Sequence, residues 1–150
     1  MTDTPESRVV SYERMVDAPS EAIFELIADP SAQPRWDGND NLGEAPQGQR
    51  VTAVGDVFRM VLTKGVVREN HVVEFEEGRR IAWMPAEEGS APIGQLWRWE
   101  LEPRGAGTLV RHTYDWTQLA DPQRLPRARA TTADKLQASV DRLAALAERG

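Results

Sequence analysis

The chain has 150 residues, the length of one ordinary domain, which leaves no room for a second full-sized hydrophobic core. It carries 24 acidic and 18 basic residues, and its net charge of −6 disfavours binding to nucleic acid phosphates or to anionic lipid surfaces. The absence of cysteine excludes disulfides, thiolate catalysis and cysteine-ligated metal centres.

The remaining composition is typical of a folded domain, with 40% hydrophobic and 28% charged residues. Residues 1–7 are polar and lack the basic-then-apolar order of a signal peptide. No run of about 18 apolar residues occurs anywhere in the chain. We therefore expect a single domain over 1–150 with a disordered tail at 1–7, located in the cytoplasm, without membrane insertion and without a nucleic-acid partner.

The first elements predicted along the chain are a strand followed by short helices. Residues 9–17 read as a strand, and a helix begins at residue 18, with proline in its first turn, and ends at Asp29 before a second proline. A second helical turn is predicted over 31–36. Residues 37–49 are rich in Gly, Asn, Asp and Gln, which predicts a loop.

The middle of the chain alternates apolar and polar residues in the period of β-strands. Five strands are predicted there, over residues 57–64, 66–77, 80–84, 95–101 and 108–116, with a hairpin connection at 103–107. Counting across that hairpin places His112 and Tyr114 on the same face as Trp97 and Trp99.

The last stretch, 122–149, changes to a helical period, with apolar residues three, four or seven apart. A single helix of that length would run about 40 Å at about 1.5 Å per residue. The order of elements therefore predicts an α+β fold in which a curved antiparallel sheet of about six or seven strands wraps around the long C-terminal helix, with two short helices after the first strand. Small residues at 128–133 predict a cavity between that helix and the sheet.

Such a cavity is expected to bind an apolar small molecule. Its predicted lining combines the inward strand residues with one face of the last helix. The lining candidates are Phe58, Met60, Glu69, Val73, Phe75, Gln95, Trp97, Trp99, Val110, Thr132 and Leu136. Trp97 and Trp99 would form a flat apolar wall, whereas Trp36 and Trp83 are expected only to pack in the core.

Several motifs of this chain resemble the START-like (SRPBCC) superfamily, and more narrowly its polyketide cyclase/dehydrase and lipid-transport group. The resemblance covers about residues 8–148 and implies the helix-grip fold of the birch-pollen allergen. Members of the group bind, carry or cyclise small molecules or assist other proteins, and no catalytic residue is shared by all of them. The motifs are Ala18-Pro-Ser-Glu-Ala-Ile-Phe-Glu-Leu-Ile-Ala-Asp-Pro30, Pro34-Arg-Trp36, Arg80-Ile-Ala-Trp83, Trp97-Arg-Trp-Glu-Leu101 and Gly107-Thr-Leu-Val110.

Three residues are candidates for acid–base catalysis: His71, His112 and Tyr114. An imidazole exchanges protons near neutral pH, and a phenol can donate to a developing enolate oxygen. The alternative is that these side chains orient a ligand or satisfy one another in the core. Glu69, on the predicted face of His71, is either a base whose pKa is raised by burial or a residue of the rim.

Other motifs give no support for metals or cofactors, and we expect neither. The loop 37–41 offers oxygen ligands but lacks the glycine and the bidentate glutamate of a calcium loop, so we interpret it as a polar loop at the cavity mouth. The chain contains no phosphate-binding glycine loop and no serine elbow. Arg124, Arg127 and Arg129 form either a solvated face or a site for an acidic head group or acidic partner.

Three functions remain open from the sequence. The first is binding or carriage of an apolar small molecule, lipid or polyketide-like. The second is a cofactor-independent polyketide cyclase or dehydratase using the acid–base residues above. The third is an interaction module of the chaperone-assisting kind, and a homodimer is possible because edge strands of such a sheet can pair.

Overall fold

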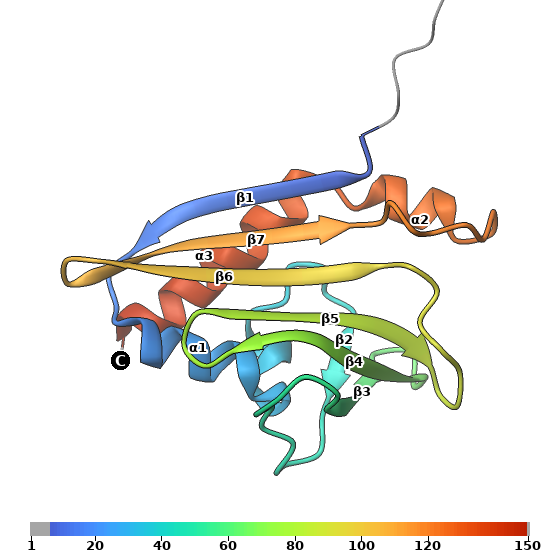
Figure 1. Cartoon of the computed structure of the whole chain (residues 1–150), viewed down its shortest axis with the longest axis horizontal. Helices are drawn as coiled ribbons and strands as arrows, with labels where there is room; N and C mark the ends of the chain where they lie inside the picture. The colour runs from blue at the N-terminus through green and yellow to red at the C-terminus, as the bar shows by residue number, and fades with distance from the viewer. Residues whose placement is uncertain (1–6, 150) are drawn as a thin grey trace, which may run out of the picture.

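The computed structural model describes residues 7–149, so the tail predicted over 1–7 lies, except for Ser7, outside the described residues. Seven strands and four helical segments follow one another along the chain (Figure 1). They are β1 Val9–Val16, α1 Ser20–Ala28, η1 Pro30–Arg35, β2 Leu42–Glu44, β3 Val57–Leu62, β4 Val67–Glu76, β5 Arg80–Glu87, β6 Leu96–Arg104, β7 Gly107–Asp115, α2 Leu125–Ala130 and α3 Ala133–Arg149.

The strands form one antiparallel sheet in the order β1-β7-β6-β5-β4-β3-β2. Figure 1 shows α3 crossing behind β1, β7 and β6, which confirms the α+β helix-grip fold with seven strands. The short strand β2 lies inside the segment predicted as loop. No helix in the described part of the chain is long and apolar enough to cross a membrane.

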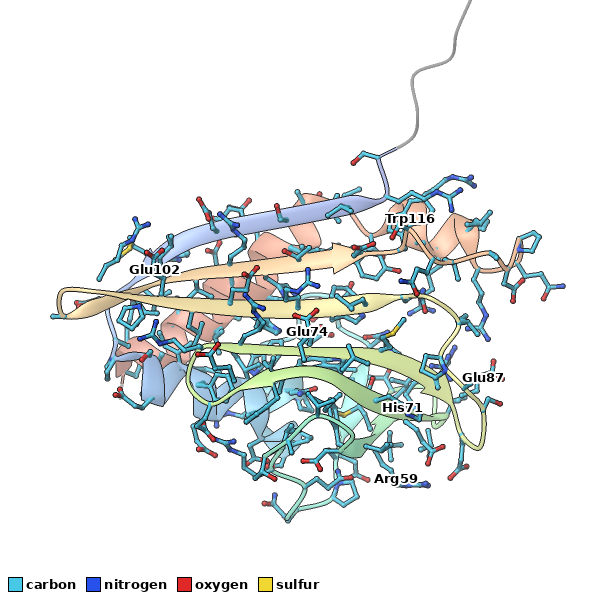
Figure 2. All side chains as sticks on the ribbon, viewed as in Figure 1. Arg59, His71, Glu74, Glu87, Glu102 and Trp116 are labelled. Carbon is cyan, nitrogen blue, oxygen red and sulfur yellow. The ribbon has the colours of Figure 1, made fainter. Side chains whose placement is uncertain are left out.

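The two faces of the sheet differ in chemistry. The outer face carries ion pairs between neighbouring strands, such as Glu74 with Arg98 at 2.6 Å and Glu13 with Arg111 at 2.8 Å. Figure 2 shows Glu74 on the side of the sheet opposite to α3. The inner face packs its apolar side chains against α1 and α3 and forms the main hydrophobic core.

The hairpin of β6 and β7 has the register expected from counting across its turn. Trp97 lies opposite Tyr114 and Trp99 lies opposite His112, all on the inner face. The short connection contains no bulge, so the alternation of side chains is preserved along both strands.

Strand β4 departs from the predicted alternation. The pairing of β4 with β5 shifts register at Val73, a β-bulge that leaves Val73 39% exposed. Before the bulge Glu69 and His71 occupy the outer face, and after it Phe75 turns inward and packs edge-on against Phe24 at 5.7 Å between ring centroids. The prediction that these four β4 residues share one inward face is therefore wrong.

The predicted single helix over 122–149 is interrupted. Thr131 has extended backbone, with ψ of 90°, and ends α2, and α3 begins at Ala133. The hydroxyl of Thr131 donates to the Arg127 carbonyl at 3.1 Å, and the hydroxyl of Thr132 bonds to the carboxylate of Asp134. The bond of Thr131 is to a backbone group, and threonine side chains that compete for backbone partners favour helix ends over helix interiors. The helix that packs on the sheet, α3, is 17 residues long, about 25 Å.

The loop 37–41 is attached to the middle of α3. The amide of Gly38 donates to the Ser139 hydroxyl at 2.7 Å, and Arg142 donates to the Asp37 carbonyl oxygen at 2.7 Å. A Cβ atom at position 38 would lie 2.5 Å from the carbonyl oxygen of Lys135, so only glycine allows this approach. These contacts fix the loop over the inner face of the sheet.

We predict that Ser139→Ala lowers the free energy of unfolding by about 1–3 kcal/mol, because it leaves the buried Gly38 amide without a partner. Gln137→Ala, on the exposed side of α3, is the matched control and should change stability by less than about 0.5 kcal/mol. Urea unfolding of the three proteins measures both values. Equal stabilities of the two variants would contradict the role given to Ser139.

Candidate functional site

A cavity of about 310 Å³ lies between the inner face of the sheet, the loop 37–41 and α2. This volume is at the lower end of the range of small-molecule sites. The apolar part of its wall consists of Trp36, Leu42, Met60, Leu62, Trp83, Pro85, Trp97 and Trp99. Polar side chains are Gln33, Asp37, Asn39, Asn41, Asn70, Gln95, His112, Tyr114, Gln123 and Thr131, and the cations are Lys64, Arg68, Arg124 and Arg127.

The structure brings together six of the residues predicted for the site: Met60, Gln95, Trp97, Trp99, His112 and Tyr114 line the cavity. The other predicted site residues lie outside it: Phe58, Glu69, His71, Val73, Phe75, Val110, Thr132 and Leu136. Two causes account for four of these eight differences. The face of β4 is reversed between Glu69 and Val73, and the helix break moves Thr132 out of the cavity.

Three of the residues outside the cavity fill the core. Phe58 packs edge-on against Trp83 at 5.3 Å, and Val110 and Leu136 are fully buried. Thr132 is exposed between α2 and α3. None of these four side chains lines the cavity.

Two polar candidates lie on the outer face of β4. The carboxylate of Glu69 accepts from the Gly89 amide at 2.7 Å and pairs with Arg59 at 3.3 Å. His71 lies opposite Val57 and Met84, and its Nε2 atom is buried without a hydrogen-bond partner among residues 7–149. Neither side chain reaches the cavity.

Stacked rings form the floor of the cavity. His112 stacks on Trp99 with 3.7 Å between ring centroids, and Tyr114 lies against Trp97 at 4.3 Å. Trp36 contacts Trp99 edge-on at 5.1 Å and donates its indole N–H to the Leu26 carbonyl at 2.8 Å. Trp36 and Trp83, expected only to pack, therefore line the cavity as well as the core.

His112 is held in one neutral form. Its Nδ1 lies 3.0 Å from the carbonyl oxygen of Arg98, and since a carbonyl only accepts, Nδ1 carries the proton. Complete burial lowers the pKa of His112 to about 3, with a smaller opposing effect of that hydrogen bond. At neutral pH the ring therefore has no proton to give as an imidazolium, and Nε2 is a hydrogen-bond acceptor.

Tyr114 is arranged as a hydrogen-bond donor. Its hydroxyl oxygen accepts from the Gln95 amide at 3.0 Å, which leaves its own proton available for another acceptor. Burial raises the pKa of Tyr114 above its ordinary value, against smaller opposing effects of Gln95 and Arg127. The phenol is therefore protonated at neutral pH.

Asp37 is the one carboxylic acid among the described residues that line the cavity. Burial raises the pKa of Asp37, and hydrogen bonds from Asn39 partly oppose this effect. With its amide oriented to satisfy both neighbours, Asn41 donates to Asp37 at 3.3 Å and accepts from Arg127 at 2.8 Å. The sequence placed the loop at the cavity mouth but did not single out Asp37, because burial of a loop carboxyl leaves no pattern in a sequence.

The cations gather where α2 meets the ends of β4 and β5. Arg124 pairs with Glu87, which Figure 2 labels at the end of β5. Arg68 points inward from β4, and the sequence missed it because Glu69 was assigned to that face. Burial and then the nearby charge of Arg124 lower the pKa of Arg68; Glu87 opposes them, and Arg127 adds a smaller lowering effect.

We predict that the free energy of unfolding falls by about 1.4 kcal/mol per pH unit, through His112 alone, as the pH drops below 6.5. Below pH 6.5, His112 of the unfolded protein binds a proton, whereas the ring in the folded protein stays neutral down to about pH 3. His112→Asn keeps an N–H donor for the Arg98 carbonyl but does not titrate, so its stability should depend less steeply on pH. Urea unfolding between pH 6.5 and 4.5 compares the two slopes, and identical slopes would refute the assignment.

Comparisons with known proteins place this chain among relatives of the same fold. The family described as polyketide cyclase / dehydrase and lipid transport matches residues 7–148. A search of curated proteins finds no significant match. A protein from Nitrosomonas europaea has a similar structure with a TM-score of 0.71, at 14% identity over 94% of both chains.

Two further solved structures are similar. DynU16, a protein in the dynemicin biosynthetic locus, has a TM-score of 0.67 at 17% identity, over 95% of this chain and 48% of that one. The Aha1 dimer from Colwellia psychrerythraea has a TM-score of 0.59 at 19% identity, over 90% of this chain and 95% of that one. Structural similarity at such identities shows the fold, whereas the family match covers nearly the whole sequence. The chain therefore belongs to the polyketide cyclase / dehydrase and lipid transport family.

Proposed function

We propose that this protein binds an apolar small molecule in the cavity between the sheet and the C-terminal helices. The observation that carries the proposal is the aromatic floor, in which Trp97, Trp99, His112 and Tyr114 stack in pairs beside about 310 Å³ of space. Flat rings offer large contact areas to a planar ligand at little cost in conformational entropy. The family description is consistent with such a ligand.

Polar groups on the same floor would orient the ligand. Tyr114 presents a hydroxyl donor, and His112 has an acceptor nitrogen, Nε2, without a partner among the described residues. A few fixed polar groups in an apolar wall are typical of specific small-molecule sites. A ligand with one acceptor and one donor on a ring system would match this pair.

The volume limits the size of the ligand. At about 30 Å³ per water-sized group, the space holds on the order of ten heavy atoms. This favours a one- or two-ring compound or a medium-length acyl chain over a sterol, unless the loop 37–41 moves. Native mass spectrometry of the purified protein would detect a retained molecule of that mass.

Acid–base catalysis is the second candidate, and Asp37 favours it. A carboxyl whose pKa is raised by burial can accept a proton from a substrate, and the protonated Tyr114 can donate to the oxygen that becomes an enolate. His112, a candidate from the sequence, would serve as a hydrogen-bond acceptor in that reaction because its pKa lies near 3. The interaction module and the homodimer stay predictions, for which the Aha1 dimer is a structural precedent.

We predict that Trp97→Leu weakens binding of 2-naphthamide, a neutral two-ring probe, about tenfold, because it removes part of the aromatic floor. Phe75→Leu is the matched control, since Phe75 is also a half-buried aromatic residue but lies outside the cavity. It should bind the probe with wild-type affinity. Titration calorimetry measures both, and equal weakening by the two substitutions would argue against the cavity as the binding site.

A separate test addresses catalysis. Asp37→Asn keeps the size of the side chain and one acceptor oxygen, which can still accept from Asn39, but it cannot accept a proton as a carboxylate does. Once a turned-over substrate is found, we expect this variant to lose at least about a hundredfold in kcat while its ligand affinity stays near wild type. Unchanged turnover would exclude Asp37 as the base and leave binding as the function.

A further inference from the structure

The mouth of the cavity has the opposite charge to the rest of the molecule. Four cations line it, namely Lys64, Arg68, Arg124 and Arg127, against a single carboxyl, Asp37. The whole chain has a net charge of −6. The local excess of basic residues at the entrance is therefore opposite in sign to the net charge of the chain.

Most arginines of this protein have carboxylate partners, but two at the mouth do not. Arg98, Arg111 and Arg142 each contact an acidic side chain within 3 Å. Within residues 7–149, Arg68 and Arg127 form no ion pair, and the partner of Arg127 is the amide oxygen of Asn41. The side chain of Arg68 is half-buried.

The two arginines also repel each other. Arg124 and Arg127 both act unfavourably on the charge of Arg68, and Glu87, the carboxylate that favours it, is already paired with Arg124. A half-buried charge beside like charges lowers stability unless a counter-charge is supplied. A bound anion would supply that counter-charge.

We propose that the mouth of the cavity binds an oxyanion, a carboxylate or a phosphate, carried by the apolar ligand, with Arg68 and Arg127 as its principal partners. The inference rests on the proposed function, because the apolar part of the ligand occupies the aromatic floor. Guanidinium groups match both oxyanions with paired N–H donors. Tyr114, whose hydroxyl proton is available and whose pKa responds to the nearby Arg127, provides a further donor.

Titration calorimetry with three probes of one ring system tests the proposal: 2-naphthoate, its neutral isostere 2-naphthamide, and 2-naphthyl phosphate. We expect 2-naphthoate or the phosphate to bind at least about tenfold more tightly than the amide. The tighter of the two charged probes identifies the oxyanion. A higher salt concentration should weaken the charged probes and leave the amide unaffected.

Substitutions of the two arginines test whether the preference for charged probes arises at the mouth of the cavity. Arg68→Gln and Arg127→Gln should each weaken the charged probe about tenfold and leave 2-naphthamide unchanged, so the amide also reports that the cavity is intact. Arg104→Gln, in the exposed β6–β7 hairpin, makes the same change in net charge and should alter neither affinity.

Each failure has a distinct meaning. Equal affinities for 2-naphthoate, 2-naphthyl phosphate and 2-naphthamide would overturn the oxyanion inference and leave the proposed function standing. A preference for charged probes that survives both Arg68→Gln and Arg127→Gln would overturn the assignment to the mouth. No binding of any probe to the wild-type protein would count against the proposed function itself.

Discussion

A single helix cannot cover a seven-stranded sheet, and the rest of this structure follows from that constraint. Seven strands spaced about 4.8 Å apart span about 29 Å, whereas one helix is about 10–12 Å wide. Here α3 packs against β1 and β7, and α1 and η1 bury part of the remaining inner face. Over β3 to β6, toward α2, the cover is a polar loop and a short helix. The cavity is the part of the inner face that no apolar helix reaches.

The helix break decides where this uncovered region lies. Because Thr131 is extended, the chain changes direction there, and the arginines of α2 reach the cavity together with Arg68 of β4. Thr131 and Thr132, which favour helix ends, therefore account for the position of the positive entrance. At this helix break, a local preference of the backbone determines which charged side chains reach the cavity.

Features of the structure that are determined within a short stretch of chain could be predicted from the sequence. Features that depend on contacts between distant segments could not. The β6–β7 register followed from the sequence because a short hairpin without a bulge preserves alternation, so His112 and Tyr114 were placed beside Trp99 and Trp97. The predicted inward face of β4 was wrong because the bulge at Val73 inverts the alternation. Counting back from Phe75, which does face inward but lies outside the cavity, assigned His71 and Glu69 to the wrong face. Asp37, Trp36 and Arg68 became site residues only through contacts between distant segments, which periodicity does not encode. Two parts of the cavity mouth could nevertheless be recognised in the sequence: the polar loop 37–41 and the arginines near the start of α2.

The charge distribution explains how an acidic protein can present a site for anions. At physiological salt the Debye length is about 8 Å, so a ligand at the mouth is largely screened from carboxylates on the far surfaces. The local cations are much closer to it, and low-dielectric walls strengthen their field. His112 adds no competing charge, because burial keeps it neutral, and Asp37 is the single carboxyl among the described residues that line the cavity. The same burial that removes charge from the floor of the cavity therefore leaves the arginines to determine the electrostatics of its entrance.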